Sequence, residues 1–210
     1  MKEPKYFSVM GDSISTLLGY NPDGYAVYYD AVQGRCADIY SPEDTWWGMV
    51  IKALGGRLLV NNSFSGSTVC SHPAYEIESY ASSDTRTAAL HTEGKDPDVV
   101  MILMGINDFG LGFSTEQFER EYRSMLEKIR HRYQAAEIWC LTLPKCENER
   151  RRDVQMSDFC SAIRRSAEEL GCRAFDICSP AKEYITLDGY HPTREGMIAI
   201  ADEIIAASDR

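Results

Sequence analysis

The 210-residue sequence predicts an α/β domain built on a parallel sheet, and two observations lead to this class. Short apolar runs alternate with longer segments of helical periodicity, an order typical of parallel strands joined by crossover helices. The run Asp98–Met104 is apolar almost throughout, as expected for a central strand covered on both faces. No repeat, linker or low-complexity tract interrupts the alternation, so we expect a single domain over residues 1–210.

Five apolar runs predict the strands, and the turns after the first three and the loop after the fifth are polar and contain glycine. In chain order the predicted strands are Tyr6–Met10, Arg57–Asn61, Asp98–Met104, Glu137–Leu143 and Cys172–Ile177. Open parallel sheets bind their ligands outside the carboxyl ends of the strands. We therefore expect the functional residues in the turns at that edge of the sheet.

Four helices are predicted, three between the strands and one after the last strand. The run Ser41–Asp44 supplies an N-cap serine, a first-turn proline and acidic residues near the positive helix end, and the helix closes at Gly55. The others cover residues 114–133, 159–170 and 193–207, where apolar residues recur three and four positions apart. Ser114 and the glutamine three residues later form the pattern of a capping box.

The composition argues against several classes of partner. The chain carries 22 basic and 32 acidic residues, a net charge of −10, so we expect neither nucleic acid nor an anionic membrane surface as a partner. Its apolar runs are too short to span a membrane, and the N-terminus does not resemble a signal peptide. With seven cysteines in such a chain, reduced thiols and a cytoplasmic location are expected.

Three polar residues have the chemistry of an acyl-transfer site. Ser13 directly follows the first strand, and a glycine two positions earlier allows a tight turn that exposes its hydroxyl. His191 is the candidate base, because a neutral imidazole can accept the hydroxyl proton near pH 7. Asp188, three residues earlier, is placed to orient the imidazole and to stabilise its charged form.

The developing oxyanion needs hydrogen-bond donors, and the sequence offers three. They are the backbone N–H groups of Ser13 and Gly66 and the side-chain amide of Asn107. Glycine suits the second position, because no Cβ obstructs the approaching substrate. Asparagine at the third supplies a donor without a competing charge.

These residues resemble the SGNH hydrolases, also called GDSL esterases/lipases. Ser13 stands in GDSIS, Gly66 in NNSFSGS, Asn107 in GIND and His191 in DGYHP, in family order and spanning nearly the whole chain. Ile14 replaces the leucine of the name-giving motif, at a position without a catalytic role. The resemblance implies a flavodoxin-like, three-layer α/β/α sandwich with about five parallel strands. It also implies ester hydrolysis through an acyl-serine, with Asp188 completing the triad and no metal or organic cofactor.

Two other sets of residues have side chains that could bind a metal or take part in a reaction. Asp12 and Asp108 flank the motif residues, and we expect them to hold the turns by hydrogen bonds to the backbone. The pairs Cys140/Cys146 and Cys172/Cys178 are spaced too widely for a typical zinc site, so no metal is expected. Whether Cys146 and Cys178 approach each other is left open by the sequence.

The segment Tyr20–Trp47 is rich in aromatic residues and follows the candidate nucleophile. Its aromatic residues are Tyr20, Tyr25, Tyr28, Tyr29, Tyr40, Trp46 and Trp47. We expect Tyr25, Trp46 and, near the candidate base, Tyr190 to contact the substrate. The alternative, that the rings only pack the first helix and its loop, is favoured for Trp47.

The sequence thus predicts a serine esterase that acts on small carboxylic esters as its small-molecule partners, with carbohydrate O-acetyl esters expected first. Lysophospholipase and thioesterase are alternatives on the same scaffold. A non-hydrolytic nucleotide-binding protein is the alternative from another class, since Gly110 and Gly112 precede a predicted helix. That match is poor, because the third glycine of the phosphate-binding pattern is missing.

Overall fold

A computed structural model describes residues 3–36, 38–72, 80–145, 150–151, 154–178 and 184–208. Its centre is the predicted five-stranded, all-parallel sheet, and the strand order is β2-β1-β3-β4-β7. In that order the strands are Arg57–Ser63, Tyr6–Gly11, Val99–Leu103, Glu137–Leu141 and Arg173–Phe175. A separate two-stranded antiparallel ribbon pairs β5 (Arg150–Arg151) with β6 (Val154–Gln155).

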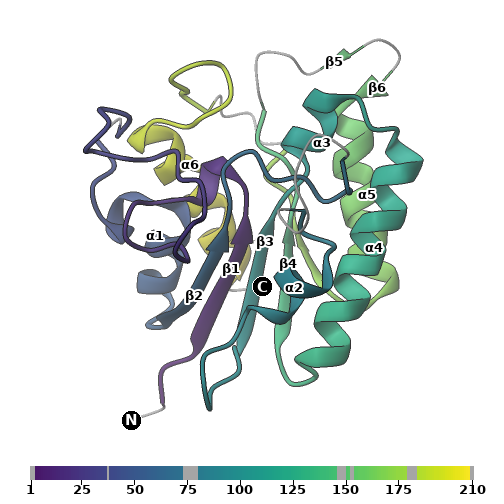
Figure 1. Cartoon of the computed structure of the whole chain (residues 1–210), viewed down its shortest axis with the longest axis horizontal. Helices are drawn as coiled ribbons and strands as arrows, with labels where there is room; N and C mark the ends of the chain where they lie inside the picture. The colour runs from purple at the N-terminus through teal and green to yellow at the C-terminus, as the bar shows by residue number, and fades with distance from the viewer. Residues whose placement is uncertain are drawn as a thin grey trace.

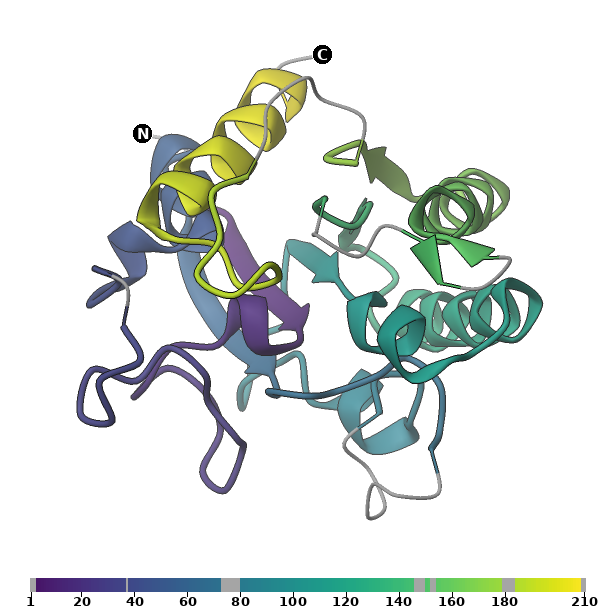
Figure 2. The same cartoon turned by 90° about the horizontal axis from the view of Figure 1, so that it is seen from above.

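Helices cover both faces of the sheet, which gives the expected three layers. Figure 2 shows α1 (Trp46–Ala53) and α6 (Arg194–Ser208) on one face, and α4 (Thr115–Arg132) and α5 (Met156–Glu169) on the other. The short helices α2 (Asp84–Ala88) and α3 (Ile106–Leu111), which the sequence analysis did not predict, follow β2 and β3 in the chain (Figure 1).

The strand order places a topological switch point beside the first strand. The chain starts in the interior of the sheet at β1, adds β2 on one side, and then crosses to add β3 on the other. The turns that leave β1 and β3 therefore diverge in opposite directions, which opens a crevice at their carboxyl ends. Ser13 leaves β1 at this crevice, and Asn107 leaves β3 there.

The core follows the predicted apolar pattern. Every residue of β3 is buried, as expected for a strand with helices on both faces. The buried face of α4 consists of Phe118, Tyr122, Met125, Leu126 and Ile129, which are the apolar positions that predicted the helix.

The first predicted helix begins later than expected. Ser41–Asp44 does form a capping box, but it caps the 3₁₀ turn η2 (Pro42–Asp44). Thr45 then adopts an extended backbone and becomes the N-cap of α1, its hydroxyl accepting a hydrogen bond from the Gly48 N–H at 3.0 Å. A Cβ on Gly48 would lie 1.8 Å from the Pro42 carbonyl oxygen, so glycine permits this sharp turn.

Two sequence predictions concern the state of the cysteines and the presence of membrane-spanning segments. The described cysteines carry free thiols, and they are Cys36, Cys70, Cys140, Cys160, Cys172 and Cys178. Cys146 lies outside the described residues, and with it the question of its distance from Cys178. Within the described part of the chain, no helix is both long and apolar enough to cross a membrane.

Candidate active site

Loops from four parts of the chain meet at the carboxyl edge of the sheet. The turns after β1, β2 and β3 bring Ser13, Gly66 and Asn107, and the loop before α6 brings Asp188 and His191. Figure 2 looks down on this edge and shows the loop before α6 lying over the end of β1. Residues near both ends of the sequence thus lie side by side.

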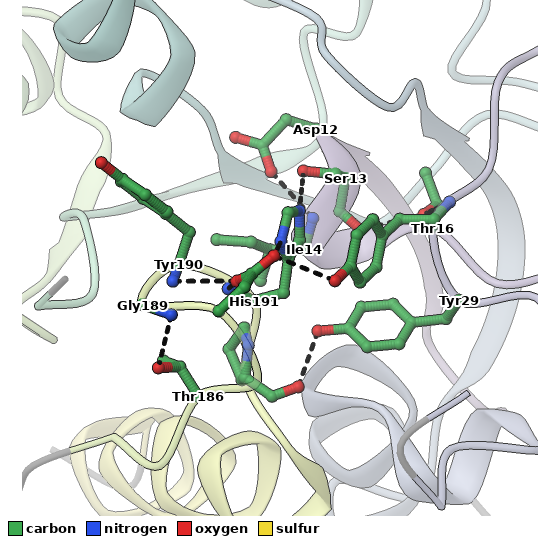
Figure 3. A network of polar contacts seen from close by, with 12 residues as sticks. Asp12, Ser13, Ile14, Thr16, Tyr29, Thr186, Gly189, Tyr190 and His191 are labelled. Atoms are coloured by element: carbon green, nitrogen blue, oxygen red, sulfur yellow. Dashed lines mark hydrogen bonds and ion pairs between the residues drawn. The ribbon is translucent and has the colours of Figure 1, made fainter. Parts of the chain in front are cut away.

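Ser13, His191 and Asp188 form a continuous chain of hydrogen bonds. The Ser13 Oγ lies 2.9 Å from the His191 Nε2 (Figure 3). The His191 Nδ1 lies 2.7 Å from the Asp188 Oδ2. With the Nδ1 proton donated to the carboxylate, Nε2 is the nitrogen left to accept the serine proton. This is the geometry that a nucleophile, its base and an orienting acid require.

The loop before α6 has a local structure that brings the acid and the base together. The Asp188 Oδ1 accepts hydrogen bonds from the backbone N–H groups of Tyr190 at 3.1 Å and His191 at 2.8 Å. Gly189 takes a φ of +88° inside this turn, a conformation that glycine adopts without strain. One carboxylate oxygen therefore shapes the turn, while the other orients the imidazole.

The surroundings set the protonation states needed for a base. Burial lowers the pKa of His191, although the Asp188 carboxylate beside it works in the opposite direction. Burial disfavours ionisation of Asp188, but the hydrogen bonds from the His191 backbone and ring outweigh it and lower the pKa of Asp188 to about 2. At neutral pH the pair is therefore an ionised carboxylate and a neutral imidazole.

The turn that carries Ser13 leaves its backbone donor available. Ser13–Ser15 is a 3₁₀ turn, η1, capped by Asp12, whose carboxylate accepts from the Ile14 N–H at 3.0 Å rather than from Ser13 (Figure 3). A Cβ on Gly11 would lie 2.4 Å from the Ser15 Oγ, so this glycine lets the turn fold tightly against the strand end.

The other two expected oxyanion donors lie on turns that are hydrogen-bonded to each other. Gly66 has a φ of +82° in a turn closed by the Ser67 N–H and the Phe64 carbonyl, so the turn does not use the Gly66 N–H. The Asn107 Nδ2 donates to the Ser67 carbonyl at 2.8 Å. One amide proton of Asn107 thus fixes its side chain, and the second is left for a substrate oxygen.

A small cavity of about 260 Å³ opens beside the candidate nucleophile. It is lined by Ser13, Ile106, Asn107, Gly110, Leu111, Tyr190 and His191. Candidate catalytic groups therefore form one wall, and apolar side chains form much of the rest. Its volume lies just below the usual range for ligand pockets, about 300–1,000 Å³.

Comparison with known proteins identifies the family. The family model described as GDSL-like lipase/acylhydrolase matches residues 5–208. The chain belongs to this family. It is accordingly a carboxylic ester hydrolase of the GDSL, or SGNH, type, and the fold expected from that resemblance is confirmed.

Solved structures share the fold of this GDSL-family chain. One, described as a GDSL-like lipase from Bacteroides ovatus, is 25% identical, with 99% of each chain covered and a TM-score of 0.75. Another, described as an arylesterase from Agrobacterium tumefaciens, is 20% identical, with 98% of each chain covered and a TM-score of 0.69. A family two carbohydrate esterase from Clostridium thermocellum, solved with cellohexaose, is 16% identical and has a TM-score of 0.68. In that case 98% of this chain and 64% of the other are covered. A comparison with curated proteins found no significant match.

The oxyanion turns of this GDSL-family chain are supported by a buried arginine that the sequence analysis did not single out. The Arg86 side chain is completely buried and donates hydrogen bonds to the Asn62 Oδ1 at 2.6 Å and the Ser67 Oγ at 2.7 Å. It also reaches the Gly11 carbonyl at 3.3 Å. Burial lowers the pKa of Arg86 to about 10, so it stays charged at neutral pH. Nothing in the local sequence distinguishes it from a surface arginine of a short helix.

Asp12 and Asp108 hold backbone groups, as expected, but Asp108 does so across the site. Its carboxylate accepts from the backbone N–H groups of Val69 at 2.8 Å and Cys70 at 2.9 Å, which ties α3 to the Gly66 turn. Both carboxyls are buried, and burial raises the pKa of Asp12 to about 7 and that of Asp108 to about 6.

The three aromatic rings that were expected to contact the substrate lie in different environments. Trp46 is completely buried and donates from its Nε1 to the Ser15 Oγ at 3.1 Å, so the expectation that it contacts substrate is wrong. Its ring supports the nucleophile turn from the core. The Tyr25 ring packs on Phe64, 4.9 Å between centroids, and does not line the cavity described above. Tyr190 does line it, and Figure 3 shows its ring pointing away from His191.

The two glycines that suggested a nucleotide-binding protein do not form a phosphate-binding loop. Gly110 lies within α3, and Gly112 caps the C-terminus of that helix with a φ of +101°. The next helix, α4, is capped by the Ser114 hydroxyl. The glycines thus end one helix instead of forming a phosphate loop before the next.

Proposed function

We propose that this GDSL-family protein hydrolyses small carboxylic esters through an acyl-serine intermediate, with Ser13 as nucleophile, His191 as base and Asp188 as orienting acid. The observation that carries the proposal is the hydrogen-bonded relay from Ser13 Oγ to His191 Nε2, 2.9 Å, and from His191 Nδ1 to Asp188 Oδ2, 2.7 Å. The relay borders a cavity large enough for a small acyl group.

The reaction has two halves. The Ser13 Oγ attacks the ester carbonyl carbon while its proton passes to His191 Nε2, and the carbonyl oxygen becomes an oxyanion. The N–H groups of Ser13 and Gly66 and the Asn107 amide donate to that oxygen. His191 then protonates the leaving alcohol as the ester C–O bond breaks. In the second half, water loses a proton to His191 and attacks the acyl-serine, which releases the acid and restores Ser13.

The cavity supports short acyl groups. Ile106, Leu111 and Tyr190 give it apolar surface, and its volume of about 260 Å³ is small for a fatty acyl chain. This favours short-chain esters over the lysophospholipase alternative. The thioesterase alternative differs only in the leaving group and is separated from ester hydrolysis by substrate tests.

Carbohydrate O-acetyl esters are the substrates we propose first. Tyr190 adds a half-buried ring at the cavity, and half-buried Tyr25 lies on the segment that follows the nucleophile turn. Aromatic rings of this kind offer flat apolar surfaces to a ring-shaped substrate. The fold shared with a carbohydrate esterase solved with cellohexaose is compatible with this choice, while the arylesterase neighbour motivates an aryl ester control.

An acyl-length series tests the proposal. p-Nitrophenyl esters from acetyl to octanoyl, a per-acetylated xylose, a lysophosphatidylcholine and an acyl thioester are assayed on wild type and Ser13→Ala. We expect kcat/KM to be highest for acetyl and to fall at least tenfold by octanoyl, with all activity lost in Ser13→Ala. Activity that rises with chain length would favour a lipid substrate, and full activity in Ser13→Ala would refute the mechanism.

A glycine in the cavity wall offers a matched variant. A Cβ added to Gly110 meets no atom within 4 Å, so Gly110→Ala reduces the free space without a clash. We expect kcat/KM for butyryl esters to fall several-fold relative to acetyl esters. An unchanged ratio would mean that the acyl group binds elsewhere. Alanine also favours the helix by about 0.5–1 kcal/mol, so folding is not at risk.

A cytoplasmic location stays a prediction. The free thiols described above are compatible with a reducing compartment. Cell fractionation of the native host, with alkylation of thiols before lysis, would test it.

A further inference from the structure

We propose that Tyr28 is a positioning residue for the proton relay, holding the His191 ring and the Asp188 carboxylate in their productive orientation. The inference rests on the proposed function of Ser13, His191 and Asp188. In the sequence, Tyr28 is one of several aromatic residues of its segment, and nothing there indicates a role for it.

Tyr28 contacts both the base and the acid of the relay. Its ring lies flat on the His191 imidazole, with 3.5 Å between centroids and 7° between planes. Its hydroxyl donates to the Asp188 Oδ2 at 3.1 Å, the same oxygen that accepts from His191 Nδ1 at 2.7 Å. One side chain therefore restrains the imidazole from its face and the carboxylate from its edge.

The backbone of Tyr28 is anchored to the nucleophile turn. Its N–H donates to the Thr16 Oγ1 at 2.9 Å. The Thr16 hydroxyl in turn donates to the Ser13 carbonyl at 2.9 Å. The next residue, Tyr29, donates its hydroxyl to the Pro192 carbonyl at 2.7 Å, directly after the base. The Tyr28–Tyr29 segment thus links the two loops of the relay, which are far apart in the sequence.

The contacts suit the charge changes of the reaction. When His191 takes the serine proton it becomes a cation, and the negative face of an aromatic ring attracts a cation. Burial, with Asp188 adding to its effect, raises the pKa of Tyr28 to about 12, so its hydroxyl remains a donor throughout the working range. Tyr28 can therefore hold the Asp188 carboxylate in place and stabilise the His191 imidazolium at the same time.

Removing the ring tests the proposal. In Tyr28→Leu we expect kcat to fall about 10- to 100-fold with KM changed less than about twofold, the size of loss that misplaced catalytic groups cause. Tyr28→Phe keeps the stack and is expected to recover all but about threefold. Tyr40→Leu, which removes an exposed ring of the same segment, is the matched control and should leave kcat unchanged.

A double variant separates positioning from general packing. Because Tyr28 acts through His191, adding Tyr28→Leu to His191→Ala should cost no further activity on an activated p-nitrophenyl ester. An equal loss in both backgrounds would overturn the proposal, as would wild-type kcat in a folded Tyr28→Leu. If Ser13→Ala stays active, the proposed function has failed instead, whatever Tyr28 does.

If Tyr28→Leu does not fold, the Tyr28→Phe variant tests the positioning role. Loss of the hydroxyl removes one hydrogen bond from Asp188, which leaves a more basic partner for the imidazolium. The pKa of His191 should then rise and move the acid limb of kcat/KM up by about 0.3–0.5 unit. Asp188 and Tyr28 are the titratable groups that contact the ring, and the Arg35 guanidinium lies 6.0 Å from the centroid of the Tyr28 ring, which Tyr28→Phe retains. An unmoved limb with unchanged kcat would overturn the proposal.

Discussion

The proton relay and the oxyanion side of this active site hold their charged groups in different surroundings. On the relay side, the side chains of Asp188 and His191 are 43% and 18% exposed. Behind the oxyanion donors, Arg86, Asp12 and Asp108 are 0%, 1% and 0% exposed. The relay therefore contacts solvent, whereas the oxyanion side rests on buried ionisable groups.

The difference follows from what each side does during a turnover. In the proposed mechanism His191 gains and loses a proton in every cycle, so its pKa must stay near the working pH, which partial hydration allows. The oxyanion donors keep one protonation state, and their value lies in being fixed before the charge develops. Buried, fully hydrogen-bonded groups such as Arg86 and Asp108 provide that rigidity, but removing one partner is costly.

The largest effect is expected from the relay itself. Ser13→Ala and His191→Ala should each lower kcat by about 10⁴- to 10⁶-fold, and the double variant should be no worse than either, because triad members act as a unit. Steady-state assays with an activated ester measure all three. Losses that multiply would show that the two residues do not share a step.

The buried side should respond mainly in stability. Arg86→Leu removes a buried charge and the hydrogen bonds that it donates to Asn62 and Ser67, so we expect the free energy of unfolding to fall by about 3–5 kcal/mol. Arg165→Leu is the control, because Arg165 forms an exposed ion pair with Glu119, and it should cost less than about 1 kcal/mol. Urea unfolding followed by tryptophan fluorescence compares them. Equal losses would remove the contrast between buried and exposed charges.

Replacing Asn107 is expected to change both kcat and the free energy of unfolding, but to different extents. Asn107→Ala should lower kcat about 10²- to 10³-fold, the usual loss for one oxyanion donor. It should lower the free energy of unfolding by only about 1 kcal/mol, since one hydrogen bond to Ser67 is lost. Kinetics and urea unfolding on one preparation provide both numbers. A large stability loss with unchanged kcat would move Asn107 from the chemistry to the scaffold.

The smallest expected effect is a modest shift of the acid limb in the pH profile of kcat/KM. Burial lowers the pKa of His191, so kcat/KM should fall toward acid with a midpoint below the ordinary histidine value of about 6.5. The sign is fixed by the role: the protonated ring cannot accept the serine proton. Asp188, with a pKa of about 2, stays ionised over this range. A midpoint well above 6.5, or a flat acid side, would contradict the assignment.

The sequence predicted the parallel sheet and the relay, because their signals are local. Apolar β3 and the glycine-bearing turns have patterns that short windows reveal, and the family motifs bring Ser13 and His191 together. It did not predict Arg86 or Tyr28, whose roles arise from contacts across many residues: Arg86 bonds to the ends of β1 and β2, and Tyr28 contacts a loop 160 positions away. Trp46 was misplaced for the same reason, since burial of an aromatic ring is decided by packing against distant elements such as the nucleophile turn.

Covalent labelling of the nucleophile tests the central claim most directly. The protein is treated with a fluorophosphonate, and the modified peptide is located by mass spectrometry alongside Ser13→Ala and His191→Ala. The relay predicts one added group per chain, on Ser13, with concurrent loss of esterase activity, no labelling in Ser13→Ala and slow labelling in His191→Ala. Labelling on a different residue, or full esterase activity in a protein labelled at Ser13, would contradict the account.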